Sequence, residues 1–171
     1  MTEHRKRLLI DGLVGGLVGY GAVVATFIAY DVVSGRPLFH TAALLGEALL
    51  GVPADGGLVA GAVDPGIVLA FNGLHLGAVL LFAYLSGWLV YEAELHPDFW
   101  YVSLVMFLAA TILGFGGVLA VTVMLGVVLS PWLVAVTAVL GALAVAAWLL
   151  GGHWSLVRFI RDSRLSDVAI E

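Results

Sequence analysis

The sequence predicts an all-α integral membrane protein, a bundle of four transmembrane helices with both chain ends on the cytoplasmic side. Of its 171 residues, 62% are hydrophobic and only 11% are charged, whereas soluble globular domains carry about 25% charged residues. The apolar residues gather in four stretches, each reaching the roughly 20 residues that cross a hydrocarbon core about 30 Å thick. Six of the seven Lys and Arg residues lie near the two chain ends.

The four transmembrane helices are predicted, in chain order, at residues 8–33, 66–91, 99–124 and 129–150. The first is too long for the roughly 7 to 15 apolar residues of a signal peptide, so we expect it to be retained. Pro97 and Asp98 mark the start of the third, with Asp98 as its N-cap. Tryptophans at the helix ends, such as Trp88 and Trp132, suit the membrane interface. The chain is predicted to form one membrane domain.

Two further segments do not cross the membrane. Residues 37–50 predict a short amphipathic helix that lies in the outer interface or packs against the bundle, because Leu38, Leu45 and Leu49 fall near one helical face. Residues 151–171 predict a cytoplasmic amphipathic tail whose arginines meet anionic lipid.

The cations predict the orientation, because Lys and Arg beside a transmembrane helix stay on the cytoplasmic side. One cluster, at residues 5–7, precedes the first helix, and Arg158, Arg161 and Arg164 follow the fourth. Four crossings put both clusters on one side, so the prediction is N-in and C-in, in a prokaryotic cytoplasmic membrane. The bilayer is the expected partner, and nucleic acid is not, since the net charge is −5 and there is no basic face.

Glycines in the first two transmembrane helices predict close helix packing. Small residues four positions apart let helix backbones approach closely. We expect those of the first helix to meet another helix of this chain, although a different subunit is the alternative. The predicted helix-packing residues are Gly12, Gly15, Gly16, Gly19, Gly73 and Gly77.

Asn72 and His75 are the polar pair most deeply placed in the membrane. They lie three residues apart on one face of the second helix, about midway through the outer half of the bilayer, where polar groups face protein or water. The functional interpretation is a haem or quinone contact through His75, with Asn72 in support. The structural interpretation, which we favour, is an interhelical hydrogen bond, with Tyr20 among the candidate partners. No second histidine lies at matching depth, so a haem or quinone site needs a partner subunit.

Two acidic residues mark the ends of the first helix. We expect Asp11 to pair locally with Arg7, and Asp31 to remain in the outer headgroup zone near Arg36. Acidic residues are missing from the centre of every predicted span, which argues against an ion or proton pump.

The remaining patterns exclude several activities. The chain has no cysteine, so disulfides, thiol chemistry and Cys-ligated metals are excluded. We find no Walker loop, nucleophile elbow or metalloprotease motif, and we expect no catalytic residues and no enzyme activity of its own. His96 and His153, beside Glu92 and Glu94, offer metal-binding atoms, but we interpret them as solvated interface residues, so no metal site is predicted.

Three segments resemble a group of small, uncharacterised bacterial four-helix membrane proteins. These segments are residues 35–46 (GRPLFHTAALLG), 72–75 (NGLH) and 91–97 (YEAELHP). Members of that group are often encoded beside respiratory haem-copper oxidase genes, so the resemblance implies an accessory or assembly role around a terminal oxidase.

We therefore expect a non-catalytic subunit or accessory factor of a larger membrane complex. Its expected partners are the other membrane subunits of that complex. One alternative is a haem- or quinone-binding protein that uses His75. The other is a small oligomeric channel or carrier, although the third and fourth helices have too little polarity to line a continuous lumen alone.

Overall fold

A computed structural model describes residues 3–51, 63–96, 100–124 and 130–152. These residues form five helices and no strand, and four of the helices are long and apolar enough to cross a membrane. The predicted all-α class with four candidate spans is confirmed. Pro97, Asp98 and the predicted tail from residue 153 onward lie outside the described residues. The helices are α1 (Glu3–Val33), α2 (His40–Leu50), α3 (Pro65–Leu95), α4 (Trp100–Met124) and α5 (Pro131–Gly152).

Three helices extend beyond their predicted bounds, and of these α5 ends at Gly152 rather than at residue 150. α1 begins at Glu3 rather than at residue 8, because Arg and Lys are good helix formers and Arg7 pairs with Asp11 one turn later (3.9 Å). α3 continues past residue 91 to Leu95. At its start, Pro65 occupies the first turn and the Asp64 carboxylate accepts the Gly66 N–H (2.7 Å), which is a standard N-terminal signal.

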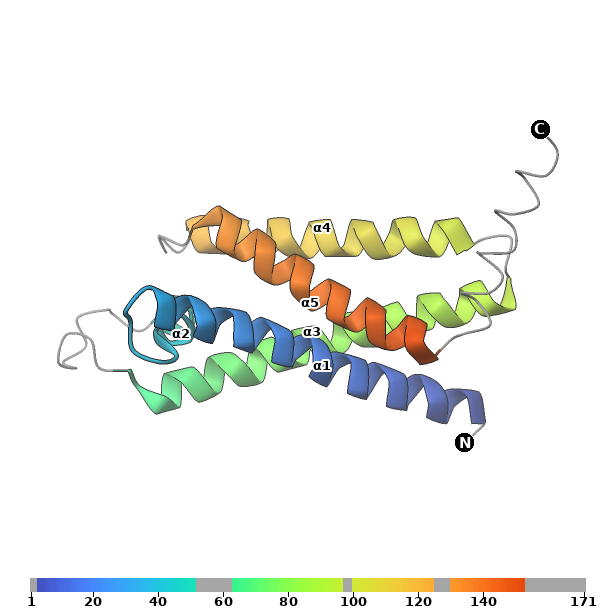
Figure 1. The fold of residues 1–171 in the computed structure, drawn as a ribbon, viewed down its shortest axis with the longest axis horizontal. Helices are drawn as coiled ribbons and strands as arrows, with labels where there is room; N and C mark the ends of the chain where they lie inside the picture. The colour runs from blue at the N-terminus through green and yellow to red at the C-terminus, as the bar shows by residue number, and fades with distance from the viewer. Residues whose placement is uncertain (1–2, 52–62, 97–99, 125–129, 153–171) are drawn as a thin grey trace.

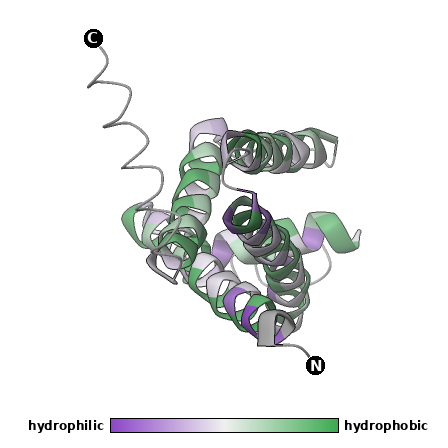
Figure 2. Ribbon diagram, turned by 90° about the vertical axis from the view of Figure 1, so that its right-hand side faces the viewer, coloured by the Kyte–Doolittle hydropathy of each residue, from purple (hydrophilic) through white to green (hydrophobic). Residues whose placement is uncertain are grey.

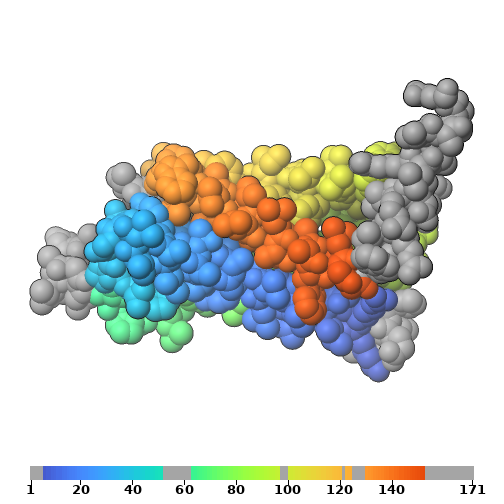
Figure 3. All heavy atoms as spheres, viewed as in Figure 1, coloured from blue at the N-terminus to red at the C-terminus, as the bar shows by residue number. Residues whose placement is uncertain are grey.

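α1 is the central helix of the bundle. It makes its most extensive contacts with α3 and α5, which run antiparallel to it on two sides, while α4 lies on the far side of α3 and α5 (Figure 1). The short helix α2 packs on α3 at the end of the bundle where α1 finishes. The space-filling view shows α1, α2 and α5 forming one continuous face (Figure 3).

The glycines of α1 form two stripes, one for each neighbouring helix. A Cβ added to Gly12 or Gly16 would lie 3.1 Å from a Cα atom of α3, that of Tyr84 or of Leu80. On the other stripe, a Cβ at Gly15 would meet Trp148 of α5 at 3.2 Å, and one at Gly19 would meet Val145 at 2.6 Å. Both stripes therefore make contacts inside this chain, as we expected for this helix, and they bring the helix backbones together.

Gly73 and Gly77 of α3 do not take part in these contacts. A Cβ at either position would meet nothing within 4 Å, and both residues are exposed. Gly73 and Gly77 lie seven residues before Leu80 and Tyr84, so they are on the same side of α3 but about two turns nearer its start, where an added Cβ meets no described residue. The prediction that these two glycines pack helices together therefore does not hold within the described chain.

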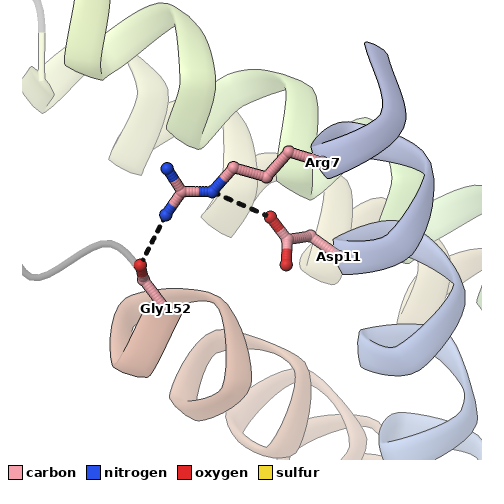
Figure 4. A network of polar contacts seen from close by, with 3 residues as sticks. All are labelled: Arg7, Asp11 and Gly152. Atoms are coloured by element: carbon pink, nitrogen blue, oxygen red, sulfur yellow. Dashed lines mark hydrogen bonds and ion pairs between the residues drawn. The ribbon is translucent and has the colours of Figure 1, made fainter. Parts of the chain in front are cut away.

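A polar contact ties the start of α1 to the end of α5. The Arg7 guanidinium donates a hydrogen bond to the Gly152 carbonyl (2.8 Å), while its Nε lies 3.9 Å from the Asp11 carboxylate (Figure 4). The last carbonyls of a helix have no partner within it, and they carry the negative end of its dipole. Arg7 thus stabilises the end of α5 and holds both helix ends at one end of the bundle.

Five serine and threonine hydroxyls of the long helices bond to the backbones of their own helices. Thr26, Ser86, Thr111, Thr122 and Thr137 each donate to a carbonyl three or four residues earlier. Hydrophobic residues lie along the long helices (Figure 2). A hydroxyl that bonds to its own helix has its hydrogen bond satisfied among apolar residues and forms no polar path between helices.

α4 contacts the rest of the bundle through a small area. Its Phe107 ring packs against Phe82 of α3, with ring centroids 5.5 Å apart. Two cavities between the helices, of about 190 and 400 Å³, lie on either side of this contact. Within α4, only Thr122 is buried among the residues whose side chains are described. The larger cavity reaches His75 of α3.

We expect Gly16→Leu to destabilise the bundle, because the new side chain would occupy space that Leu80 of α3 already fills. Overpacking of this kind costs about 1–3 kcal/mol. Gly21→Leu is the matched control, since a Cβ at Gly21 meets nothing within 4 Å. Thermal unfolding in mild detergent, followed by circular dichroism, measures the difference. Equal unfolding temperatures for both variants would contradict the glycine contact.

Candidate functional site

The polar pair of α3 lies against α1. The Tyr20 hydroxyl donates to Asn72 Oδ1 (2.8 Å), and Asn72 Nδ2 donates to the Val68 carbonyl one turn earlier (2.8 Å). Asn72 therefore makes the interhelical hydrogen bond that the structural interpretation expects, with Tyr20. Its amide has a partner on both its oxygen and its nitrogen, so its main role in the structure is to join α1 and α3.

His75 differs from Asn72, because the contacts described for its ring are with aromatic residues. Phe71 stacks on the imidazole, with centroids 5.7 Å apart and planes 18° apart, and the Tyr20 ring lies at 6.1 Å. The Nε2 atom of His75 is buried and has no hydrogen-bond partner among the described residues. A buried polar nitrogen without a partner costs free energy, so a hydrogen bond from another molecule to this atom would be stabilising.

The cavity of about 400 Å³ extends from His75 between α3 and α4, with α2 at one end. Its lining is almost entirely apolar. Thr122 also lines it, but that hydroxyl donates to the Leu119 carbonyl (2.9 Å). His75 therefore supplies the unpaired polar atom of the lining. The other lining residues used below are Phe27, Leu45, Phe71, Gly114 and Gly117.

Asp31 determines where α2 sits, and through α2 it shapes the end of the cavity. The carboxylate is fully buried and accepts hydrogen bonds from the Thr41 N–H (3.1 Å) and the Thr41 hydroxyl (2.5 Å). Phe39, the residue at the N-cap of α2, makes no side-chain cap, so Asp31 performs this role from the preceding helix. Its charge also lies at the positive end of the α2 dipole.

The backbone of Asp31 closes the turn between α1 and α2. Its carbonyl accepts the Arg36 N–H (2.8 Å), and the Gly35 N–H donates to Val32 (3.1 Å), with Gly35 in the left-handed region at φ 67°. This is a Schellman motif, for which glycine is the preferred residue. The Asp31 carboxylate, which we expected to remain in the headgroup zone near Arg36, is instead buried in contact with Thr41. The Arg36 guanidinium lies over the Tyr30 ring instead, 5.5 Å from its centroid.

A second contact seats α2 on α3. A Cβ added at Gly46 would lie 2.6 Å from the Ile67 side chain and 3.0 Å from its carbonyl oxygen. The prediction placed α2 in the interface or against the bundle, and it packs against the bundle. Asp31 and Gly46 were not identified as site-forming residues. The sequence did offer one signal for Asp31. The predicted helix at 37–50 has no capping side chain at its start, and Asp31 is the nearest preceding carboxylate that could replace it.

The histidines and carboxylates do not assemble into a metal site within the described residues. No group of three or more His, Cys, Asp or Glu side chains there could hold a metal ion. His153, one of the residues considered near His96, lies outside this part of the chain. At the cavity, His75 offers a single nitrogen, which suits a hydrogen bond to an organic ligand.

Asp31→Ala should loosen α2, because it leaves the buried Thr41 N–H and hydroxyl without their acceptor. Such a loss costs about 1–3 kcal/mol. We expect faster hydrogen exchange at the α2 amides and a lower unfolding temperature. Asp31→Asn is the matched control: it keeps one acceptor oxygen and should retain more of the protection. Unchanged exchange in Asp31→Ala would show that α2 is held by other contacts.

Comparison with known proteins adds no assignment to this site. No family model, no curated protein and no solved structure matches the chain. The resemblance to small four-helix bacterial membrane proteins therefore stays a prediction. What the site can bind rests on its own residues and their contacts.

Proposed function

We propose that this chain is a non-catalytic subunit or accessory factor of a larger membrane complex. In this proposal its four long helices cross a prokaryotic cytoplasmic membrane with both ends inside, and it acts by presenting a helix face to a neighbouring membrane protein. Two considerations support the proposal. One is the distribution of charge and apolar surface, and the other is an outward face of α3 that has no partner among the described residues.

The apolar surface supports membrane insertion. Large hydrophobic side chains are exposed along all four long helices, including Leu69 at 75% and Leu113 at 74%. Water would make such a surface strongly unfavourable, whereas lipid accommodates it. Arg7, at the end of the bundle shared by the start of α1 and the end of α5, belongs to the cationic cluster that favours the cytoplasmic side.

The observation that carries the docking proposal is the outer stripe of α3, which comprises Leu69, Gly73, Gly77 and Leu81. These residues recur every four positions, so they lie along one side of the helix. All four are exposed, and the two glycines have nothing within 4 Å of an added Cβ. On α1, glycines at the same spacing receive another helix. The outer stripe of α3 has the same features and is free to receive a helix of another protein.

The channel alternative receives less support. Thr111 and Thr122 of α4 donate to carbonyls of their own helix, and the cavities beside α4 have apolar linings. An ion path requires polar groups along its whole length. The resemblance noted in the sequence makes a respiratory haem-copper oxidase the first complex to test as the partner.

The proposed orientation can be tested by single cysteines, since the natural chain has none. Ser34→Cys, between α1 and α2, should react with a membrane-impermeant thiol reagent added to intact cells. His96→Cys, at the end of α3, should react only after the membrane is permeabilised. The opposite labelling pattern would contradict the N-in, C-in orientation.

The docking proposal predicts that Gly77→Leu separates the chain from its complex without unfolding it. A leucine there has free space in the isolated chain but would hold an approaching helix away. We expect the complex recovered from native membranes in mild detergent to lose at least tenfold of this subunit, a change of about 1.4 kcal/mol.

Gly21→Leu on α1, which also has open space, is the control and should co-purify like the natural chain. The unfolding temperatures of both purified variants should match that of the natural chain. Recovery of the natural chain only as a monomer, or only with copies of itself, would overturn the accessory role.

A further inference from the structure

We propose that the cavity beside His75 binds a small hydrophobic molecule whose flat ring carries a carbonyl or hydroxyl group, the chemistry of a membrane quinone. The His75 imidazole would hydrogen-bond the oxygen of the ring after a small shift of the side chain that opens its buried Nε2 to the cavity. This site lies between α2, α3 and α4, and its lining shares no residue with the outer stripe of α3. It goes beyond the docking role, and neither depends on the other.

The size and lining of the cavity suit such a ligand. Ligand sites occupy about 300–1,000 Å³ and combine apolar walls with few polar groups that set orientation. This cavity measures about 400 Å³ and is lined by side chains such as Phe27, Leu45 and Leu74, with His75 among them. The apolar walls favour a ligand that is itself dissolved in the membrane.

The polar contact is specific to His75. Its Nε2 is buried without a hydrogen-bond partner in the described chain, whereas the polar atoms of Asn72 and Thr122 already have partners. In a neutral imidazole each nitrogen is either a donor or an acceptor, according to the tautomer. Nε2 can therefore donate to a ring carbonyl or accept from a ring hydroxyl, so the same atom serves an oxidised or a reduced quinone.

The walls favour a flat ring over a branched ligand. Phe27 and Phe71 line the cavity on the side of α1 and α3, and aromatic faces pack well against a planar ring. On the side of α4, Gly114 and Gly117 line it, and a Cβ at either would meet nothing within 4 Å. A wall without side chains at two positions one turn apart leaves a smooth surface against which a ring can lie.

Other hydrophobic occupants fit these observations less well. A lipid acyl chain would fill the volume but leave Nε2 without a partner. A haem held by two axial histidines would need a second nitrogen, and His75 is the one histidine among the described residues that line this cavity.

The test is a titration of the full-length protein in phosphatidylcholine nanodiscs with a benzoquinone that carries a short alkyl chain. Calorimetry measures binding, and protein-free nanodiscs give the partition background. We expect saturable binding that His75→Leu weakens about 3- to 10-fold, the range for loss of one hydrogen bond. His75→Gln, which retains a donor and an acceptor, should bind more tightly than His75→Leu.

A second pair of variants tests the cavity itself. Gly117→Leu places a side chain in the cavity and should weaken binding by more than tenfold. Gly116→Leu is the matched control, because its Cβ position is equally open but lies outside the cavity lining, and it should bind like the natural chain. Both variants should unfold at the temperature of the natural chain, which separates a blocked site from a damaged fold.

Three outcomes would overturn the proposal. The first is an absence of saturable binding by the natural chain. The second is binding that Gly117→Leu abolishes but His75→Leu leaves unchanged, which would identify an apolar chain as the occupant. The third is a Soret band on addition of haemin that His75→Leu removes, together with loss of quinone binding. The docking role is tested on Gly77 by co-purification, so the two proposals can fail separately.

Discussion

The close approach of α1 to two neighbouring helices is the constraint on which the rest of the structure depends. Gly12 and Gly16 admit the backbone of α3, while Gly15 and Gly19 admit side chains of α5. Lipid tails are as apolar as leucine, so burial of apolar surface does not drive helices together in a bilayer, and close van der Waals contact must do so. With α1 held between α3 and α5, the hydrogen bond from Tyr20 to Asn72 and the contact of Arg7 with Gly152 follow from that register.

Asp31 connects α1 to α2 at the end of the bundle where α1 finishes, so the position of α1 also determines where α2 lies. One residue caps two helices, since its carbonyl ends α1 and its carboxylate begins α2. The placement of α2 over α3 then shapes the cavity beside His75. An ionisable side chain buried this completely is costly unless its oxygens are bonded, and both oxygens are bonded here to one residue, Thr41. The cavity therefore depends on a residue that does not contact the proposed ligand oxygen.

The helices could be predicted from the sequence because length and apolar composition alone decide whether a segment can span a bilayer. The α1 glycines could be predicted for a related reason: their spacing is local and visible. The α3 glycines have the same spacing, yet a Cβ at either would meet no described residue within 4 Å, because spacing does not say along which turns two helices stay close. Asn72 and His75 were identified as a pair, but only the fold shows that Asn72 has its partners while His75 Nε2 does not. The role of Asp31 was missed because its partner belongs to another helix.

The contact between α1 and α5 joins the first and last long helices of the described chain. During synthesis α1 is made first, and α5 follows only after α2, α3 and α4. The stripe of Gly12 and Gly16 can be covered once α3 is made, whereas the stripe of Gly15 and Gly19 stays without its partner until α5 is made. The contact between α1 and α5 therefore forms late, after the other described helices have been synthesised.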